Sequence, residues 1–225
     1  MKIVLLPGLD GMGDMFAPFL SVLDGFETQI IALPNTGKQD YETLTSYVMS
    51  QLPDEAFILV AESFSGPIAA QISAKSPPHL KGIVFVASFL SSPNRALLFL
   101  AKLLPLNLLA RLPLSRFVLR FLFLGSVAGD DLMDLFQSTV KKLSPKLMKA
   151  RLETLQSLDF ECFSSELPVV YILPSSDKLV PQFKSEQFKV CYKNVEIKIV
   201  EGPHFLLQAK PVEGAYIVTE FVNSL

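Results

Sequence analysis

The feature that most constrains the fold of this chain is the stretch 57–73, in which an apolar run ends at a serine and a helical pattern begins at once. A strand, a sharp turn and a helix in immediate succession hold the serine at the turn, Ser63, in a strained backbone conformation that exposes its hydroxyl. Strand and helix nearly touch beside such a turn, so only small side chains fit two residues to either side of it. Ala61 and Ser65 occupy these two places and Gly66 follows, so the stretch predicts a nucleophilic serine between a buried strand and a helix.

Ser65 is the rival nucleophile, because the segment Ala-Glu-Ser-Phe-Ser-Gly holds two serines that are two residues apart. Two places after Ser65 stands Pro67, whose ring suits the tight turn less well than a small side chain does. Ser63 is therefore the predicted nucleophile, and Glu62 before it is expected to point away and to be structural. Taken alone, the stretch also fits an ordinary serine-rich loop between a strand and a helix.

Short apolar runs recur along the whole chain, and most of them are apolar almost throughout, which is typical of strands covered on both faces. Helical patterns separate these runs, and strands that alternate with helices predict a parallel sheet with helices on both sides. The predicted strands are Ile3–Leu6, Gln29–Leu33, Phe57–Ala61, Gly82–Ala87, Val169–Leu173 and Glu196–Val200; the predicted helices are Asp14–Leu23, Tyr41–Leu52, Pro67–Lys75 and Val212–Asn223.

Chemically interesting residues follow three other strands, at the carboxyl ends where ligands bind to sheets of this type. The glycine-rich segment 7–14 follows the first strand, and it matches neither the dinucleotide nor the Walker phosphate pattern, which favours a loop whose N–H groups face an oxyanion. Asp177 follows the fifth strand, where a turn-forming role is the alternative. His204 follows the sixth strand, whereas His79 precedes a strand and is expected on the surface at the opposite end of the sheet.

Composition excludes several classes of function. The chain has 225 residues, enough for one large domain, and its net charge of −2 gives no sign of a nucleic-acid surface. Cys162 and Cys191 lack paired spacing and the chain has only two histidines, so we expect neither a zinc site nor any other metal or cofactor. The apolar run Ile3–Leu6 is too short for a signal peptide, which makes a cytoplasmic location the expectation. The oligomeric state stays open.

A segment of about residues 91–161 is too long for one crossover helix and is expected to form a helical cap inserted into a core made of 1–90 and 162–225. Its first part, Ala96–Leu124, consists mostly of leucine and phenylalanine, with Lys and Arg residues that interrupt it before the length of a membrane span is reached. Three interpretations stay open: a lid packed on the core, a lid that lines an acyl pocket above Ser63, or a weak association with a membrane surface.

Together these motifs resemble the α/β-hydrolase superfamily over nearly the whole chain. The resemblance is carried by Pro7-Gly-Leu-Asp-Gly-Met-Gly, Glu62-Ser-Phe-Ser-Gly-Pro, Asp177-Lys-Leu-Val-Pro and Gly202-Pro-His-Phe, in this order. The chain is most similar to small bacterial carboxylesterases that act on pimeloyl-carrier methyl esters, and its first two motifs also resemble plastid phytyl ester synthases. The sequence departs from the family at Pro7, where a histidine is common, and at Ala61 and Ser65, where glycines are common.

The resemblance implies an α/β-hydrolase fold of about six mainly parallel strands, with helices on both faces and an inserted cap. It implies that Ser63 attacks an acyl carbon, that His204 takes its proton and that Asp177 orients the imidazole. It also implies that the backbone N–H groups of Leu9 and Phe64 hold the oxyanion. The expected function is hydrolysis of small hydrophobic esters or thioesters, and the alternatives are an acyltransferase or thioesterase with the same triad and a binding protein without catalysis.

Overall fold

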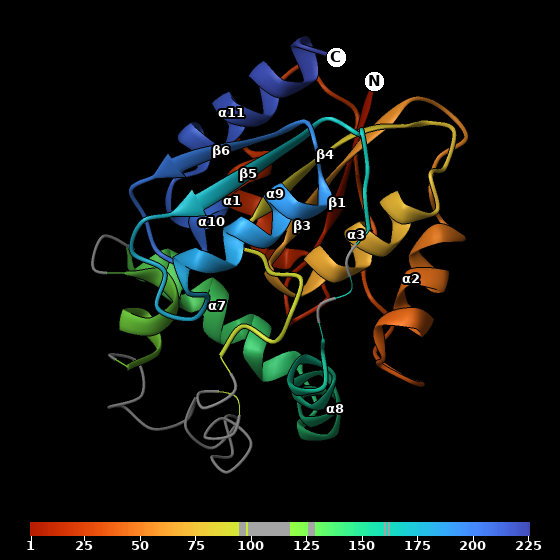
Figure 1. Cartoon of the computed structure of the whole chain (residues 1–225). Coiled ribbons are helices and arrows are strands. Elements are labelled where there is room, and N and C mark those ends of the chain that lie inside the picture. The colour runs from red at the N-terminus through yellow and green to blue at the C-terminus, as the bar shows by residue number, and fades with distance from the viewer. Residues whose placement is uncertain (95–97, 99–117, 126–128, 160, 162) are drawn as a thin grey trace.

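A sheet of six parallel strands forms the centre of the computed structural model, which describes residues 1–94, 98, 118–125, 129–159, 161 and 163–225 (Figure 1). The strands lie in the order β2-β1-β3-β4-β5-β6, so that β1 is second from one edge, with β2 outside it and β3 to β6 following in chain order on its other side. Their bounds are β1 Lys2–Leu6, β2 Thr28–Ile30, β3 Phe57–Glu62, β4 Leu80–Val86, β5 Val169–Pro174 and β6 Val195–Val200. The parallel sheet predicted from the alternating pattern is confirmed.

Each face of the sheet has its own hydrophobic core, because successive side chains of a strand point to opposite faces. In β1, Ile3 and Leu5 join one buried cluster with Phe19, whereas Val4 and Leu6 join the other. The first face is covered by α1 (Ala17–Leu20), α10 (Leu206–Ala209) and α11 (Pro211–Asn223), and the second by α2 (Tyr41–Met49), α3 (Gly66–Ala74) and α9 (Glu186–Cys191). The sheet is thus the middle layer of three.

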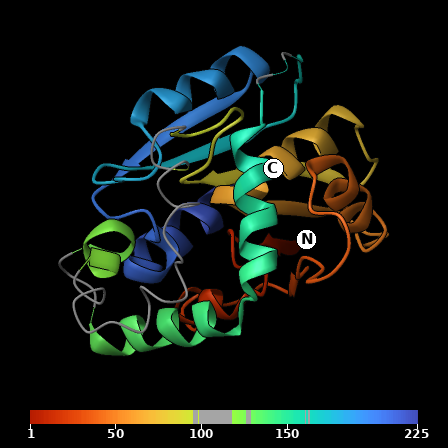
Figure 2. The same ribbon diagram turned by 90° about the horizontal axis from the view of Figure 1, so that it is seen from below.

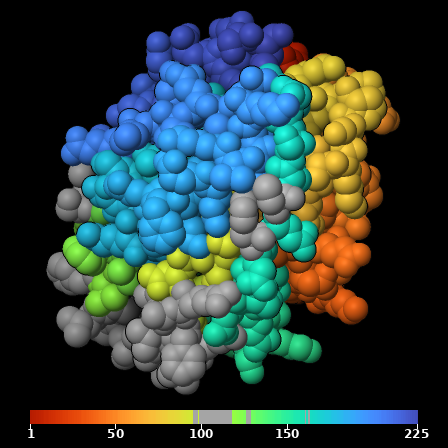
Figure 3. All heavy atoms as spheres, in the orientation of Figure 1, coloured from red at the N-terminus to blue at the C-terminus, as the bar shows by residue number. Residues whose placement is uncertain are grey.

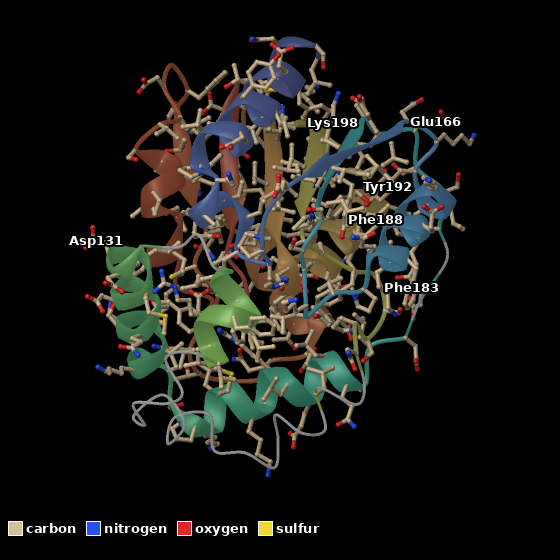
Figure 4. All side chains as sticks on the ribbon, turned by 90° about the vertical axis from the view of Figure 1, so that its left-hand side faces the viewer. Asp131, Glu166, Phe183, Phe188, Tyr192 and Lys198 are labelled. Atoms are coloured by element: carbon tan, nitrogen blue, oxygen red, sulfur yellow. The ribbon has the colours of Figure 1, made fainter. Side chains whose placement is uncertain are left out.

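The segment around α9 was not predicted from the sequence, and it closes the second core beside β4 and β5. It begins with a short 3₁₀ turn, η4 (Gln182–Ser185), which Pro181 precedes. The Phe188 ring lies 4.6 Å from the Phe85 ring and 4.7 Å from the Tyr171 ring, measured between centroids. In the space-filling view this segment and β6, coloured blue, cover one side of the molecule (Figure 3), and Figure 4 labels Phe188 on it.

Two predictions about secondary structure are wrong in detail. The helix expected at Asp14–Leu23 is a 3₁₀ turn, η1 (Asp14–Phe16), followed by the short α1. The reason is Pro18, which has no N–H to donate to the carbonyl of Asp14 four residues earlier, so the N–H of Ala17 bonds there instead. The strand expected at Gln29–Leu33 is also shorter, since β2 covers Thr28–Ile30. At the other edge of the sheet, β6 has no buried residue and Ile199 is 70% exposed.

The predicted cap segment contains two long helices, α7 (Asp130–Lys142) and α8 (Pro145–Gln156). The chain breaks at Leu143, and Ser144 caps α8 by accepting a hydrogen bond of 3.1 Å from the N–H of Leu147. Figure 2, viewed from below, shows α8 crossing the middle of the molecule with α7 beside it. Most of Ala96–Leu124 lies outside the described residues, so the three interpretations of that segment stay predictions.

A third, smaller apolar cluster packs α7 against η1. It contains Met15 from η1, Leu119, Leu124 at the end of the π-helical turn η3 (Arg120–Leu124), and Met133 and Phe136 from α7. The rings of Phe123, Phe136 and Phe205 meet within the same cluster, with centroids 5.2 to 5.8 Å apart. Within the described ranges, no helix has the length and apolar character needed to cross a membrane.

Candidate active site

Ser63 lies at the turn between β3 and α3 with a backbone φ of 48°, which is the left-handed region that residues with a side chain rarely adopt. Its carbonyl is held by a hydrogen bond of 2.9 Å from the hydroxyl of Ser88, at the end of β4. A Cβ at Gly66 would come within 1.6 Å of that hydroxyl oxygen, so glycine is required at this place. The strained serine and the tight approach of two chain segments confirm the turn geometry predicted from the sequence.

The rival, Ser65, has a different role in the structure. Its side chain is fully buried, and its hydroxyl donates a short hydrogen bond to the carbonyl of Pro7 in the loop after β1. Ser65 therefore attaches the turn that carries Ser63 to the glycine-rich loop. Its hydroxyl is occupied in this contact and lies away from the histidine described next.

Ser63, His204 and Asp177 form a continuous hydrogen-bonded chain across the carboxyl ends of three strands. The Ser63 Oγ lies 2.9 Å from the His204 Nε2, and the His204 Nδ1 lies 2.8 Å from the Asp177 Oδ2. The other carboxylate oxygen, Oδ1, accepts hydrogen bonds from the N–H groups of Leu179 at 2.8 Å and Val180 at 3.0 Å. These backbone donors orient the carboxylate, which in turn selects the tautomer of His204 with the proton on Nδ1.

The electrostatic surroundings of His204 favour its charged form. The imidazole is 4% exposed, and this burial lowers the pKa of His204. The charge of Asp177, the hydrogen bond to Asp177 and the charge of Glu62 all act in the other direction, and together they raise the pKa of His204 above its ordinary value of 6.5. A histidine in this setting can accept a proton from Ser63 and keep it while bonds rearrange at a substrate.

The glycine-rich loop after β1 lies against Ser63. A Cβ at Gly8 would be 3.9 Å from the Cβ of Ser63, so the peptide between Gly8 and Leu9 runs directly beside the nucleophile. The loop closes on itself through a hydrogen bond of 3.0 Å from the N–H of Gly11 to the carbonyl of Gly8. No hydrogen bond within the described part of the chain uses the N–H of Leu9 as donor. The location of the loop is compatible with the oxyanion role predicted for Leu9, which stays a prediction, as does that of Phe64.

Glu62 has surroundings that the sequence did not reveal. Its side chain is 1% exposed, and its Oε2 accepts a hydrogen bond of 3.2 Å from Gln208 on α10. Its Oε1 has no hydrogen-bond partner within the described chain. Burial raises the pKa of Glu62 to about 7, against the lowering effects of Gln208 and His204. We expected a purely structural role for this residue, but its charge also acts on His204.

The remaining titratable and thiol side chains considered from the sequence lie elsewhere. His79 is exposed, and its carbonyl accepts a hydrogen bond from Phe57 at the amino end of β3, as the predicted topology requires. Asp159 and Glu161 are also exposed. Cys191 is buried at the end of α9, whereas Cys162 lies outside the described residues. Among the described residues, no group of three or more His, Cys, Asp or Glu side chains is arranged to hold a metal ion.

Comparison with solved structures gives many matches over the whole chain. An esterase from Exiguobacterium antarcticum superposes with a TM-score of 0.84 at 14% identity, covering 99% of this chain and 92% of that one. A lipase-esterase related protein from Clostridium acetobutylicum gives a TM-score of 0.77 at 17% identity, with 98% and 93% coverage. The chain has the α/β-hydrolase fold.

Sequence comparison adds nothing finer to this conclusion, because the chain matches no protein-family model and no curated protein. Structures with the α/β-hydrolase fold also carry different reaction names: a bromoperoxidase from Bacillus anthracis superposes with a TM-score of 0.79 at 17% identity, covering 99% of this chain and 91% of that one. At these identities the likeness establishes the fold alone. The reaction must be argued from the residues of the site.

The sequence analysis missed two buried charged residues, Asp10 and Arg151. Asp10, in the glycine-rich loop, is 8% exposed and accepts a hydrogen bond of 2.9 Å from the N–H of Met12. Arg151, on α8, is 1% exposed. The signal for Arg151 was present, since it shares the apolar stripe of Leu147, Met148, Leu152 and Leu155, where an arginine is out of place unless it has partners.

Proposed function

We propose that this protein is a serine hydrolase that cleaves carboxylic esters with a hydrophobic acyl or alkyl part through an acyl-enzyme intermediate. The observation that carries the proposal is the chain of contacts from Ser63 Oγ through His204 to Asp177, at 2.9 Å and 2.8 Å, which begins at a serine with a φ of 48°. The α/β-hydrolase fold and the names of its structural neighbours, esterases among them, support the same reaction class.

In the first half of the proposed reaction, Ser63 Oγ attacks the ester carbonyl carbon as its proton passes to His204 Nε2. The carbonyl oxygen becomes an oxyanion, which the N–H groups of Leu9 and Phe64 stabilise. One such donor lowers the activation barrier by about 3 to 4 kcal/mol. Asp177 stabilises the imidazolium through Nδ1. His204 then returns the proton to the leaving alcohol oxygen, and the ester bond breaks to leave the acyl group on Ser63.

In the second half, water replaces the alcohol. His204 takes a proton from the water, the hydroxyl attacks the acyl-enzyme, and the acid is released as Ser63 regains its proton. An acyltransferase or thioesterase would share the first half-reaction and differ in the acceptor or the leaving group. Adding a primary alcohol as competitor during turnover distinguishes transfer from hydrolysis, because transfer yields the new ester as the main product.

The apolar side chains next to His204 support the proposal that the substrate has a hydrophobic part. Phe205 lies edge-on to the imidazole with ring centroids 5.6 Å apart, and it connects to Phe123 and Phe136 in the third cluster. Each methylene of an acyl chain buried against such surfaces contributes about 0.8 kcal/mol, or roughly fourfold in binding. We therefore expect kcat/KM to climb with acyl length by about that factor per carbon until the pocket is full.

The test of the proposed function is reaction with a fluorophosphonate, followed by peptide mapping and an ester panel from acetyl to octanoyl. We expect a single adduct, on Ser63. In Ser63→Ala and His204→Ala, labelling should be lost and kcat should fall by a factor of about 10⁵ to 10⁶. His79→Ala should keep a rate near that of the wild type. Labelling on Ser65, or equal losses in the two histidine variants, would contradict the assignment. A monotonic fall in kcat/KM from acetyl to octanoyl esters would contradict the hydrophobic pocket.

A further inference from the structure

The most unusual buried side chain in the molecule is Arg151, whose guanidinium group lies between α8 and the loops at the carboxyl ends of the strands. A buried arginine is costly unless acceptors surround it. Here three of its nitrogen atoms donate to three different groups: Nη1 to the carbonyl of Leu9 at 2.8 Å, Nε to Gln39 Oε1 at 3.0 Å, and Nη2 to the carbonyl of Pro34 at 3.1 Å. The fork of donors thus joins two loops to one helix.

The contact with Leu9 bears on the proposed oxyanion site. The carbonyl that Arg151 holds lies in the rigid peptide plane between Leu9 and Asp10. The N–H that would face the oxyanion lies in the preceding plane, so only the φ and ψ angles of Leu9 separate it from the fixed carbonyl. The loop is shaped around the arginine: a Cβ at Gly11, which has a φ of 69°, would lie 2.4 Å from Nη1. Asp10, beside both residues, acts on Arg151 as a negative charge.

The same guanidinium group also lies near the side chain of Phe64, the residue whose N–H is the second proposed donor. Its Cζ lies 5.9 Å from the centroid of the Phe64 ring, within the range of a cation–π contact. The Phe64 ring is fully buried and packs on Tyr41 at 5.2 Å on its other side. Burial lowers the pKa of Arg151 to about 10 although Asp10 opposes the shift, so the side chain stays charged at neutral pH.

From this arrangement we propose that Arg151 is a positioning residue, which holds the backbone of Leu9 and the ring of Phe64 so that their two N–H groups converge on one oxyanion. The inference rests on the proposed function, since it needs an oxyanion to stabilise. Arg151 acts through Leu9 and Phe64 and does not touch the reacting atoms. Its loss therefore weakens binding of the tetrahedral intermediate and leaves binding of the uncharged ester nearly unchanged.

The experiment compares Arg151→Met, which keeps the length of the stem but removes every donor, with Arg151→Lys, which keeps the charge and one donor. For Arg151→Met we expect kcat to fall about 10²-fold, as for a misplaced oxyanion donor, with KM within about twofold of wild type. Affinity for a trifluoromethyl ketone, which forms a tetrahedral adduct with the serine, should fall by a similar factor, whereas affinity for the product acid should not change. The kcat of Arg151→Lys should be about tenfold higher than that of Arg151→Met.

The matched control is Thr154→Val on the same helix. The Thr154 hydroxyl donates a hydrogen bond of 2.9 Å to the carbonyl of Gln39. Its removal therefore loosens α8 from the same loop and leaves the contacts of Arg151 with Leu9 and Phe64 in place. Its kcat should stay near wild type. Thermal unfolding of every variant establishes the folded fraction to which the rates are referred.

The inference is overturned if folded Arg151→Met retains wild-type kcat, if KM rises as much as kcat falls, or if Thr154→Val shows the same loss. Should Arg151→Met not fold, Arg151→Lys decides: a roughly tenfold loss in kcat at constant KM supports the positioning role, and wild-type kcat contradicts it. Failure of the proposed function is a separate result, because then wild-type protein neither reacts with fluorophosphonate nor hydrolyses any ester, and both proposals fall together.

Discussion

Two buried charged side chains flank the nucleophile, and they are treated very differently by their surroundings. Glu62, which directly precedes Ser63 in the chain, accepts one hydrogen bond from Gln208, and its Oε1 has no partner among the described residues. Arg151, between α8 and the glycine-rich loop, donates three hydrogen bonds and touches an aromatic ring. Burial moves both pKa values by a similar amount: that of Glu62 rises from 4.5 to about 7, and that of Arg151 falls from 12.5 to about 10, so only Glu62 is close to losing its charge at neutral pH.

The difference teaches what burial does to a charge in this protein. Desolvation disfavours the charged form of both groups, and only hydrogen bonds and opposite charges can offset it. Arg151 has such partners and is suited to hold other groups in place. Glu62 has fewer of them and an ordinary pKa of 4.5, so its raised pKa lies close to neutral pH and the group acts on His204 as a charge that depends on pH.

The largest effect that sharpens this comparison concerns the two acids near His204. Asp177→Asn should lower kcat about 10⁴-fold, because the amide holds the imidazole in the wrong tautomer. Glu62→Gln should cost less than tenfold, since Glu62 has no hydrogen bond to His204 among the contacts of the described residues. Steady-state kinetics on both folded variants with one soluble ester measures the two values. A mild Asp177→Asn would mean that another carboxylate orients His204.

A smaller effect concerns stability, where Glu62→Gln should raise the free energy of unfolding by up to about 3 kcal/mol above pH 7. The folded pKa of Glu62 is about 7, above its ordinary value of 4.5. Below pH 4.5 the group is neutral in both states and costs nothing; as pH rises to 7 the unfolded state ionises first, and stability is lost. Denaturant unfolding of wild type and variant at pH 4 and pH 8 checks the sign. An equal difference at both pH values would refute a titrating Glu62.

The smallest effect is on the pH dependence of the reaction. His204 must be neutral to accept the Ser63 proton, and its pKa is raised, so the acid limb of kcat/KM should lie above pH 6.5. Because the charge of Glu62 is one of the causes that raise the His204 pKa, Glu62→Gln should move this limb to lower pH. Rates of hydrolysis of a non-ionising ester between pH 5 and 9 measure the shift. Movement of the limb to higher pH would show that Glu62 does not act through its charge.

The sequence by itself determined the succession of the six parallel strands along the chain and the residues of the hydrogen-bonded chain. Local signals carried both, because an apolar run that ends at Ser63, Asp177 or His204 places each side chain at the same edge of a parallel sheet whatever the details of packing. The end of α1 and the break between α7 and α8 were less accessible, since single prolines and caps decide them. The exposure of β6 depended on which strand lies at the edge of the sheet, which the sequence does not state.

Only the tertiary structure decided the roles of Glu62 and Arg151. The state of a buried charge depends on which groups surround it in space, and the partners of these two residues are far away in the chain: Gln208 for Glu62, and Leu9, Pro34 and Gln39 for Arg151. The apolar stripe of α8 indicates that Arg151 is buried, but no local pattern says what it meets. Long-range packing supplies that information, because desolvation and hydrogen bonding are properties of the folded surroundings.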